Sequence, residues 1–286
     1  MSNNPKNIKI GFHISILNGI DKSVDRAIEL GCTTYQIFTR NPRSWKFREL
    51  RQEEVQLYNK KINNAGISPV YAHLPYIPNI SSPNPEIYFK SKQSLKEEVR
   101  RCKALEIPYI VIHLGSHLGF NETKARHRIL EAINEASENG GPMILIENSS
   151  GSGNRLGSRL EEISLLIKKA QPDLGVCFDT CHAYAAGLEL RTNNGLLETL
   201  MLIDKTFGFE KLKLIHLNDS KGDLFSGIDH HEHIGLGKIG LKGFRLILKS
   251  KLAEVPLIME TPIDNRRDNQ ENMRIVRKLA GLKTHK

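Results

Sequence analysis

Six short apolar segments of this 286-residue chain each end on a side chain that can bind a metal ion. The six end residues are His73, His113, Glu147, Asp179, His216 and Glu260. Successive end residues lie 32 to 44 positions apart, which suits one strand, one loop and one helix per unit. Parallel neighbouring strands place their carboxyl ends on one rim, so we expect these six side chains to converge on one pocket.

Three further residues of the same types are expected on that rim. His182 lies three positions after Asp179, and Asp229 and His231 form a D-x-H pair in a long polar segment. A single His or carboxylate at a strand end is usually a hydrogen-bonded structural residue or a helix cap. Nine such residues, four of them carboxylates that would repel one another without a cation, predict metal binding instead.

The residue types indicate which metal the site would hold. Imidazole-rich ligation disfavours Mg²⁺ and Ca²⁺ and suits Zn²⁺, with Mn²⁺ or Fe²⁺ as substitutes. Catalytic zinc usually takes three protein ligands, so nine ligands predict about three ions per chain. Three divalent ions and four carboxylates leave a net charge of about +2, which a hydroxide and a phosphodiester would neutralise. The inferred site is therefore suited to hydrolysing a phosphate diester.

The apolar segments alternate with helical patterns along the chain. Two more strands, at 8–15 and 34–39, bring the expected number to eight. Continuous apolar strands in strict alternation with helices predict a parallel sheet covered by helices. We therefore predict an α/β fold of the closed (β/α)8 TIM-barrel type, with a doubly wound open sheet as the alternative. No composition break divides the chain, so we expect a single domain over 1–286.

Composition limits the partners and the compartment. The formal net charge of +9 favours a phosphate-rich partner such as nucleic acid, although a lysine-rich surface is common on ordinary enzymes. Four cysteines occur without a C-x-x-C pair, which indicates reduced, buried thiols in a cytoplasmic protein. The N-terminus lacks the features of a signal peptide, and no apolar run is long enough to cross a membrane.

Six segments of the chain resemble motifs of the endonuclease IV family of apurinic/apyrimidinic endonucleases. They are VIHLGSHLG (111–119), LIENSSGSGNRLG (145–157), GVCFDTCHAYAAG (175–187), LIHLNDSKG (214–222), DHHEHIGLGKIG (229–240) and LIMETP (257–262). The resemblance covers nearly the whole chain. It implies a monomeric, zinc-dependent hydrolase of base excision repair. Such an enzyme cleaves double-stranded DNA 5′ to an abasic site and leaves a 3′-hydroxyl and a 5′-deoxyribose phosphate.

The resemblance also implies how the ligands divide among three zinc ions. The three expected ligand sets are His73, His113 and Glu147; Glu147, Asp179, His216 and Glu260; and His182, Asp229 and His231. A hydroxide bridging the first two ions would attack phosphorus, and the third ion would steady the charge on the leaving oxygen. Glu147, which bridges two ions, and Glu260, which would orient or activate the nucleophile, are therefore the expected catalytic residues.

Two loops match the segments with which the family bends DNA and extrudes the lesion. In FTRNPRSW (38–45), Arg43 is the candidate insertion residue, and in HLPYI (73–77), Tyr76 and Ile77 are the candidate wedges. The chain departs from the family at two positions. His230 stands where the family usually has Arg, and Leu236 stands where many members have an acidic residue.

The remaining histidines have weaker claims on the site. We expect His13, at the end of the first strand, and His117 to support a metal ligand by hydrogen bonding. The others are expected to face solvent or DNA: His127, His230, His233 and His285.

Two other functions are compatible with this pattern. A sugar isomerase or epimerase uses a similar barrel with one or two metals, but it has no need of a third set such as His182 with the D-x-H pair. A non-catalytic DNA-binding barrel would use zinc for stability, and structural zinc sites are usually closed and rich in Cys. The count of bound ions and the incision of an abasic duplex separate these functions from a nuclease.

Overall fold

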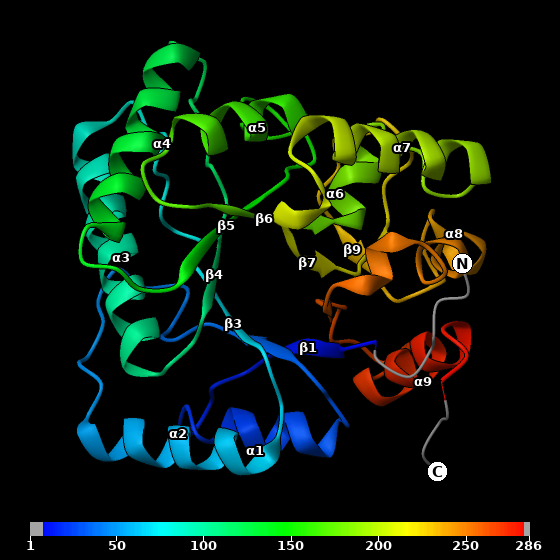
Figure 1. The fold of residues 1–286 in the computed structure, drawn as a ribbon, viewed down its shortest axis with the longest axis horizontal. Coiled ribbons are helices and arrows are strands. Elements are labelled where there is room, and N and C mark those ends of the chain that lie inside the picture. Colours follow the sequence, from blue (N-terminus) through cyan, green and yellow to red (C-terminus); the bar gives the residue numbers. More distant parts are fainter. Residues whose placement is uncertain (1–7, 283–286) are drawn as a thin grey trace.

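A computed structural model of the chain describes residues 8–282 and shows a closed barrel of parallel strands with helices outside it (Figure 1). In chain order the barrel strands are β1 (Ile10–Ile14), β2 (Tyr35–Ile37), β3 (Val70–His73), β4 (Tyr109–Ile112), β5 (Met143–Glu147), β6 (Gly175–Asp179), β7 (Leu212–His216) and β10 (Leu257–Met259). The ring closes where β1 pairs with β10, with Gly11 opposite Ile258. The predicted TIM barrel is confirmed, and the open sheet is excluded.

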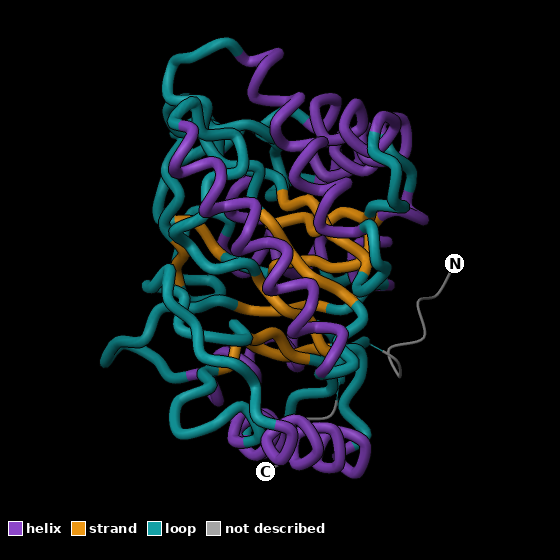
Figure 2. The backbone as a smooth tube through the Cα atoms, turned by 90° about the vertical axis from the view of Figure 1, so that its left-hand side faces the viewer, coloured by secondary structure: helices purple, strands orange, loops and turns teal. Residues whose placement is uncertain are grey.

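The helices follow the strands and surround the barrel, as the purple coils around the orange strands in Figure 2 show. They are α1 (Lys22–Glu29), α2 (Gln52–Ala65), α3 (Pro85–Ala104), α4 (Glu122–Ser137), α5 (Leu160–Lys169), α7 (Asn193–Thr206), α8 (Gly240–Ile247) and α9 (Asn269–Leu279). Local sequence fixes several of their starts. The Asn84 side chain accepts hydrogen bonds from two amides of the first turn of α3, and Pro85 begins that helix.

Three short elements near the predicted ligands were not predicted. Helix α6 (Thr180–Ala185) follows β6 directly, and its first turn is capped by the Asp179 carboxylate, which accepts from the His182 amide. Strands β8 (Asp219–Ser220) and β9 (His231–Glu232) form a small antiparallel sheet inside the long segment after β7. These elements matter because α6 carries His182 and β9 carries His231.

The barrel interior has a layered order that follows from strand geometry. Successive side chains of a strand point to opposite faces, so residues two positions apart share a face. Six buried residues from six strands form a separate cluster: Tyr71, Val111, Leu145, Cys177, Leu214 and Ile258. Each lies two positions before one of the six predicted strand-end ligands, so the ligands form the next layer toward the carboxyl ends of the strands.

The compositional expectations that the structure tests agree with it. All four cysteines are buried and unpaired. Within residues 8–282, no helix combines the length and apolar character needed to cross a bilayer. The single-domain expectation over the full chain stays a prediction.

Candidate metal centre

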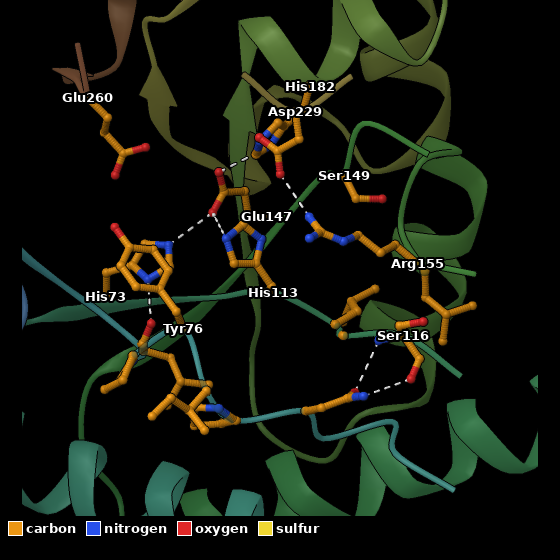
Figure 3. Close-up of a pocket in the computed structure, with 18 of the residues that line it drawn as sticks. His73, Tyr76, His113, Ser116, Glu147, Ser149, Arg155, His182, Asp229 and Glu260 are labelled. Carbon is orange, nitrogen blue, oxygen red and sulfur yellow. Dashed lines mark hydrogen bonds and ion pairs between the residues drawn. The ribbon is translucent and has the colours of Figure 1, made fainter. Parts of the chain in front are cut away.

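The structure brings all nine predicted ligands together at the carboxyl ends of the strands. Figure 3 labels six of them: His73, His113, Glu147, His182, Asp229 and Glu260. Within each group below, one candidate ligand atom per residue lies within 4.8 Å of the others. The groups are His73, His113 and Glu147; Glu147, Asp179, His216 and Glu260; and His182, Asp229 and His231. They coincide with the three sets that the family resemblance implied.

Glu147 stands between the groups. Its Oε2 lies 3.2 Å from Nε2 of His73 and 3.5 Å from Nε2 of His113. Its Oε1 lies 2.9 Å from Nδ1 of His216 and 3.4 Å from Nδ1 of His182. One carboxylate therefore belongs to the first two groups, as a bridging ligand would, and also lies near His182 of the third.

Backbone carbonyls orient three of the histidines. Each of the three has Nδ1 within hydrogen-bond distance of a backbone oxygen: His73 of Leu74 at 2.6 Å, His182 of Asn148 at 2.9 Å, and His231 of Glu260 at 3.2 Å. A carbonyl only accepts, so Nδ1 of each ring donates a proton to it and Nε2 is the nitrogen left to face the site. This arrangement, with the second nitrogen held by a neighbour, is typical of metal-binding histidines.

Gln36 orients a fourth histidine in a different way. Its Oε1 lies 2.9 Å from Nε2 of His216, so it accepts that proton and leaves Nδ1 facing the carboxylates. The Gln36 Nε2 group donates to Glu260 at 2.8 Å and lies 2.9 Å from Nδ1 of His13. His13 thus supports Glu260 rather than joining a group, and Nδ1 of His13 lies 3.2 Å from the same carboxylate oxygen.

The Nε2 atoms of the two histidines in the third group test whether a cation fits there. Nε2 of His231 is buried and has no hydrogen-bond partner among the described residues, although it lies 3.6 Å from Oδ2 of Asp179 and 3.9 Å from Oδ1 of Asp229. Nε2 of His182 lies 2.8 Å from Oδ1 of Asp229. A lone pair that faces a carboxylate is repelled unless a proton or a metal ion lies between them. The donor set therefore fits a divalent cation.

The electrostatics of the site point the same way. Burial alone would lower the pKa of His182, but attraction to Asp179 and the hydrogen bond with Asp229 outweigh it and raise that pKa to about 10. Burial would likewise raise the pKa of Glu147, but His113 and His216 hold it well below its usual value. The site favours positive charge in the third group and keeps Glu147 ionised, which is what a metal site requires.

Two cysteines also lie beside these groups. Cys177 lies near Glu147 and His216, and Cys181 lies near Asp179 and His231. Burial raises the pKa of the Cys177 thiol to about 12 and that of Cys181 still further. A thiol that keeps its proton is a poor ligand, so we assign both cysteines to packing.

Asparagines that follow two of the strands support the ligands, although they were not predicted as site residues. Asn148 accepts from the Asp179 amide at 2.7 Å, and Asn218 donates to the Asp179 carboxylate at 2.7 Å and accepts from the Glu260 amide at 2.8 Å. Both are buried. The sequence feature that could have identified Asn148 as a site residue is its position directly after the predicted ligand Glu147.

Asp219 shapes the long segment that carries Asp229 and His231. Its buried carboxylate accepts hydrogen bonds from the backbone N–H groups of four later residues: Gly235, Gly237, Ile239 and Gly240. A Cβ at Gly237 would come within 2.6 Å of the Asp219 carboxylate, so this position requires glycine. The segment is therefore folded back on β8 and holds the D-x-H pair at the site.

Two of the three residues predicted to engage DNA line a cavity of about 530 Å³ at the mouth of the barrel. Tyr76 and Ile77 line it, and the Tyr76 side chain is 65% exposed and packs edge-on against Phe38. Arg43 is exposed on the neighbouring β2–α2 loop but does not line the cavity. Their roles as wedges stay predictions.

A buried ion-pair network fixes the loop that carries Arg43. Glu98 of α3 binds Arg40 and Thr39, and Arg40 in turn donates to the Ser44 backbone. The Arg40 and Glu98 side chains are 4% and 0% exposed. Removing one partner would leave the other charge buried without compensation.

We expect Glu98→Ala to lower the free energy of unfolding by about 3–5 kcal/mol, because it leaves the Arg40 guanidinium unpaired in the interior. Chemical denaturation measures this loss. The matched control is Glu86→Ala on the same helix, where an exposed carboxylate pairs with Lys90 and the stability should change little. Equal stability of the two variants would contradict the clamping role of Glu98.

The other histidines differ from expectation at two positions, His233 and His117. His233 was expected to face solvent or DNA, which is wrong: it is fully buried and bonded to Asp264 at 3.0 Å and to Asn272 at 2.9 Å. His127 and His230 are exposed as predicted, and His285 lies outside the described residues. His117 bonds its own loop at the Phe120 carbonyl, which does not bring it to a ligand.

Comparisons with known proteins agree with this geometry. A family model described as "Xylose isomerase-like TIM barrel" matches residues 24–280. The "Probable endonuclease 4" of Methanoculleus marisnigri is 46% identical over 280 residues, which covers 96% of this chain and 99% of that protein. The crystal structure of endonuclease IV from Thermus thermophilus matches with a TM-score of 0.86 and 34% identity, over 96% of this chain and 99% of that one.

Another solved structure shares the barrel fold with this chain at much lower sequence identity. A D-tagatose 3-epimerase-like protein matches with a TM-score of 0.72 over 95% of this chain and 97% of its own, but at 18% identity. At this identity the likeness concerns only the barrel, and function has to be argued from the site.

Proposed function

Since this chain belongs to the endonuclease IV family and is a DNA-repair endonuclease, we propose that it hydrolyses the phosphodiester bond 5′ to abasic sites in double-stranded DNA. The products would be a 3′-hydroxyl and a 5′-deoxyribose phosphate. The observation that carries the proposal is the third ligand group, His182, Asp229 and His231, beside the two groups that share Glu147. We further propose that the enzyme acts as a monomer in the cytoplasm.

The site depends on metal, and we propose three Zn²⁺ ions, with Mn²⁺ or Fe²⁺ as substitutes, held by the three groups. When bound, such ions supply a nucleophile from water at neutral pH and neutralise charge on the phosphate and the leaving oxygen. The protein provides four carboxylates and five imidazoles, most of them fixed by hydrogen bonds to backbone or amide groups. Such preorganisation means that little rearrangement is needed during the reaction.

Glu260 is the residue that we assign to the attacking water. It is at the rim of the cavity, and its side chain is 20% exposed, whereas Glu147 is 1% exposed. Gln36 and His13 hold one of its oxygens, and the other lies 3.4 Å from Nδ2 of Asn218. A carboxylate fixed in this way at the cavity edge is placed to accept a proton from water and to orient it.

The direct test is incision of a duplex with one abasic site at a defined position, beside the same duplex with an intact base. We expect cleavage of the abasic duplex alone, at the 5′ side, with 3′ ends that a DNA polymerase extends. Cleavage on the 3′ side, or binding without cleavage, would overturn the proposal. An isomerase would leave both duplexes intact and interconvert small sugars instead.

Arg43→Ala should raise KM for the abasic duplex by about tenfold and leave kcat nearly unchanged. Arg43 lies on an exposed loop outside the cavity, so its loss removes contact with DNA and not with the reacting atoms. Steady-state kinetics measure the split, and fluorescence of a duplex labelled at both ends measures bending. An unchanged KM together with unchanged bending would remove Arg43 from the DNA-engaging loop.

A further inference from the structure

We propose that Arg155 binds the phosphate group that this site hydrolyses and steadies the charge that develops on it. This inference rests on the proposed function. It starts from the cavity lining: among the described residues that line it, Arg155 is the sole Lys or Arg. A phosphodiester that enters the cavity therefore meets one permanent side-chain cation, and that cation is Arg155.

Backbone pairing holds Arg155 in place. It lies in the loop between β5 and α5, and it forms an antiparallel bridge with Ser116 of the loop after β4. The flanking amide of Leu156 donates to the Gly115 carbonyl, and the Asn154 carbonyl accepts from the His117 amide. Backbone hydrogen bonds thus join the two neighbouring loops at Arg155. They fix the position of its Cα and so limit the positions that its guanidinium can reach.

The guanidinium lies directly beside the third ligand group (Figure 3). Its Nη1 donates to Oδ2 of Asp229 at 2.8 Å, while Oδ1 of the same carboxylate faces His182 at 2.8 Å. Asp229 can therefore serve the third group with one oxygen and hold Arg155 with the other. The two roles do not compete.

The rest of the guanidinium is free to bind a ligand. Its Nε and Nη2 groups make no hydrogen bond with the described residues, and the side chain is 49% exposed. An arginine presents five N–H donors in a planar fork, which matches the oxygens of a phosphate. With Nη1 on Asp229, the remaining donors are available to a non-bridging phosphate oxygen beside the third group.

The test compares Arg155→Gln and Arg155→Lys with Arg159→Gln, a matched control in the same loop whose guanidinium pairs with Glu162 and does not line the cavity. Three quantities are measured on the metal-loaded protein: kcat and KM for the abasic duplex, the bound metal per chain, and the salt dependence of DNA binding. Binding is measured in a Glu260→Gln background, so that the duplex stays intact.

We expect Arg155→Gln to keep its metal, to lower kcat/KM about 100-fold and to reduce the slope of log Kd against log salt by about one. Arg155→Lys should restore the slope, since it restores the charge, but not the full rate, since an ammonium lacks the planar fork. Arg159→Gln should match the wild type in all three measurements.

Two results would overturn the proposal. One is a wild-type salt slope and wild-type kcat/KM in Arg155→Gln. The other is loss of metal in that variant with full recovery on adding Zn²⁺, since Arg155 would then only position Asp229. A wild-type protein that binds but does not incise the duplex would contradict the proposed function instead, and the salt slope would still report on Arg155.

Discussion

Glu260→Gln should lower the single-turnover rate of incision at an abasic site by about 10³-fold while the barrel remains folded. Glutamine keeps the shape of the side chain but removes its charge and its ability to take a proton from water. Its amide NH₂ would also face the NH₂ of Gln36 or of Asn218, which now donate to the carboxylate. Rapid-quench kinetics with excess enzyme measure the chemical step without the contribution of product release.

The matched control is Glu254→Gln, which makes the same change at an exposed position near the opposite end of the barrel. It should incise at the wild-type rate and melt at the wild-type temperature. Metal content has to be measured in both variants, because Glu260 is also a proposed ligand. A Glu260→Gln protein that keeps its metal and turns over normally would refute the role given to this residue.

Stripping the metal should cost several kcal/mol of transition-state stabilisation, which corresponds to a loss of incision of about 10³-fold or more. Without the ions, the nine side chains offer no nucleophile at neutral pH, and the imidazoles are held by protons or carboxylates instead. Dialysis against a chelator followed by incision of the abasic duplex measures the loss. Adding back Zn²⁺ should restore activity, and Mn²⁺ or Fe²⁺ should restore part of it.

Elemental analysis of the restored protein tests the number of ions. We expect three per chain, and about one fewer in His231→Ala, since His231 belongs to the third group and to neither of the other two. A wild-type count of one or two would favour an isomerase-like site. Full activity after complete removal of transition metals would contradict the metal-dependent mechanism altogether.

The barrel and the ligand layer could be predicted from the sequence because both follow from strand geometry. An apolar strand that ends on a ligand-type residue, repeated at the spacing of a strand and a helix, leaves little freedom in where that residue lies. His73 and His216 are examples: each lies two positions after a buried residue of the inner cluster. The family motifs added the division of the nine residues into three groups.

The site residues that could not be predicted from the sequence either lie in irregular loops or contact the ligands from another strand of the barrel. Gln36 reaches His216 and Glu260 from β2, and nothing in the letters around it distinguishes it from an ordinary polar strand residue. Arg155 reaches Asp229 because two loops pair with each other. His233 was misplaced because its segment looks like a polar loop, but the hydrogen bonds to Asp219 fold that loop inward.

The ligand layer runs around the mouth of the barrel from β3 to β10, so bound cations would tie together strands that are held below only by apolar packing and by the sheet. They would hold six of the eight barrel strands together at their carboxyl ends, and the ligands meet only in the folded chain. Any species that binds the native state alone stabilises it by mass action. If the bound metal is the proposed zinc, the melting temperature of this protein should therefore rise with the free zinc concentration, and zinc-starved cells should lose the protein itself as well as its activity.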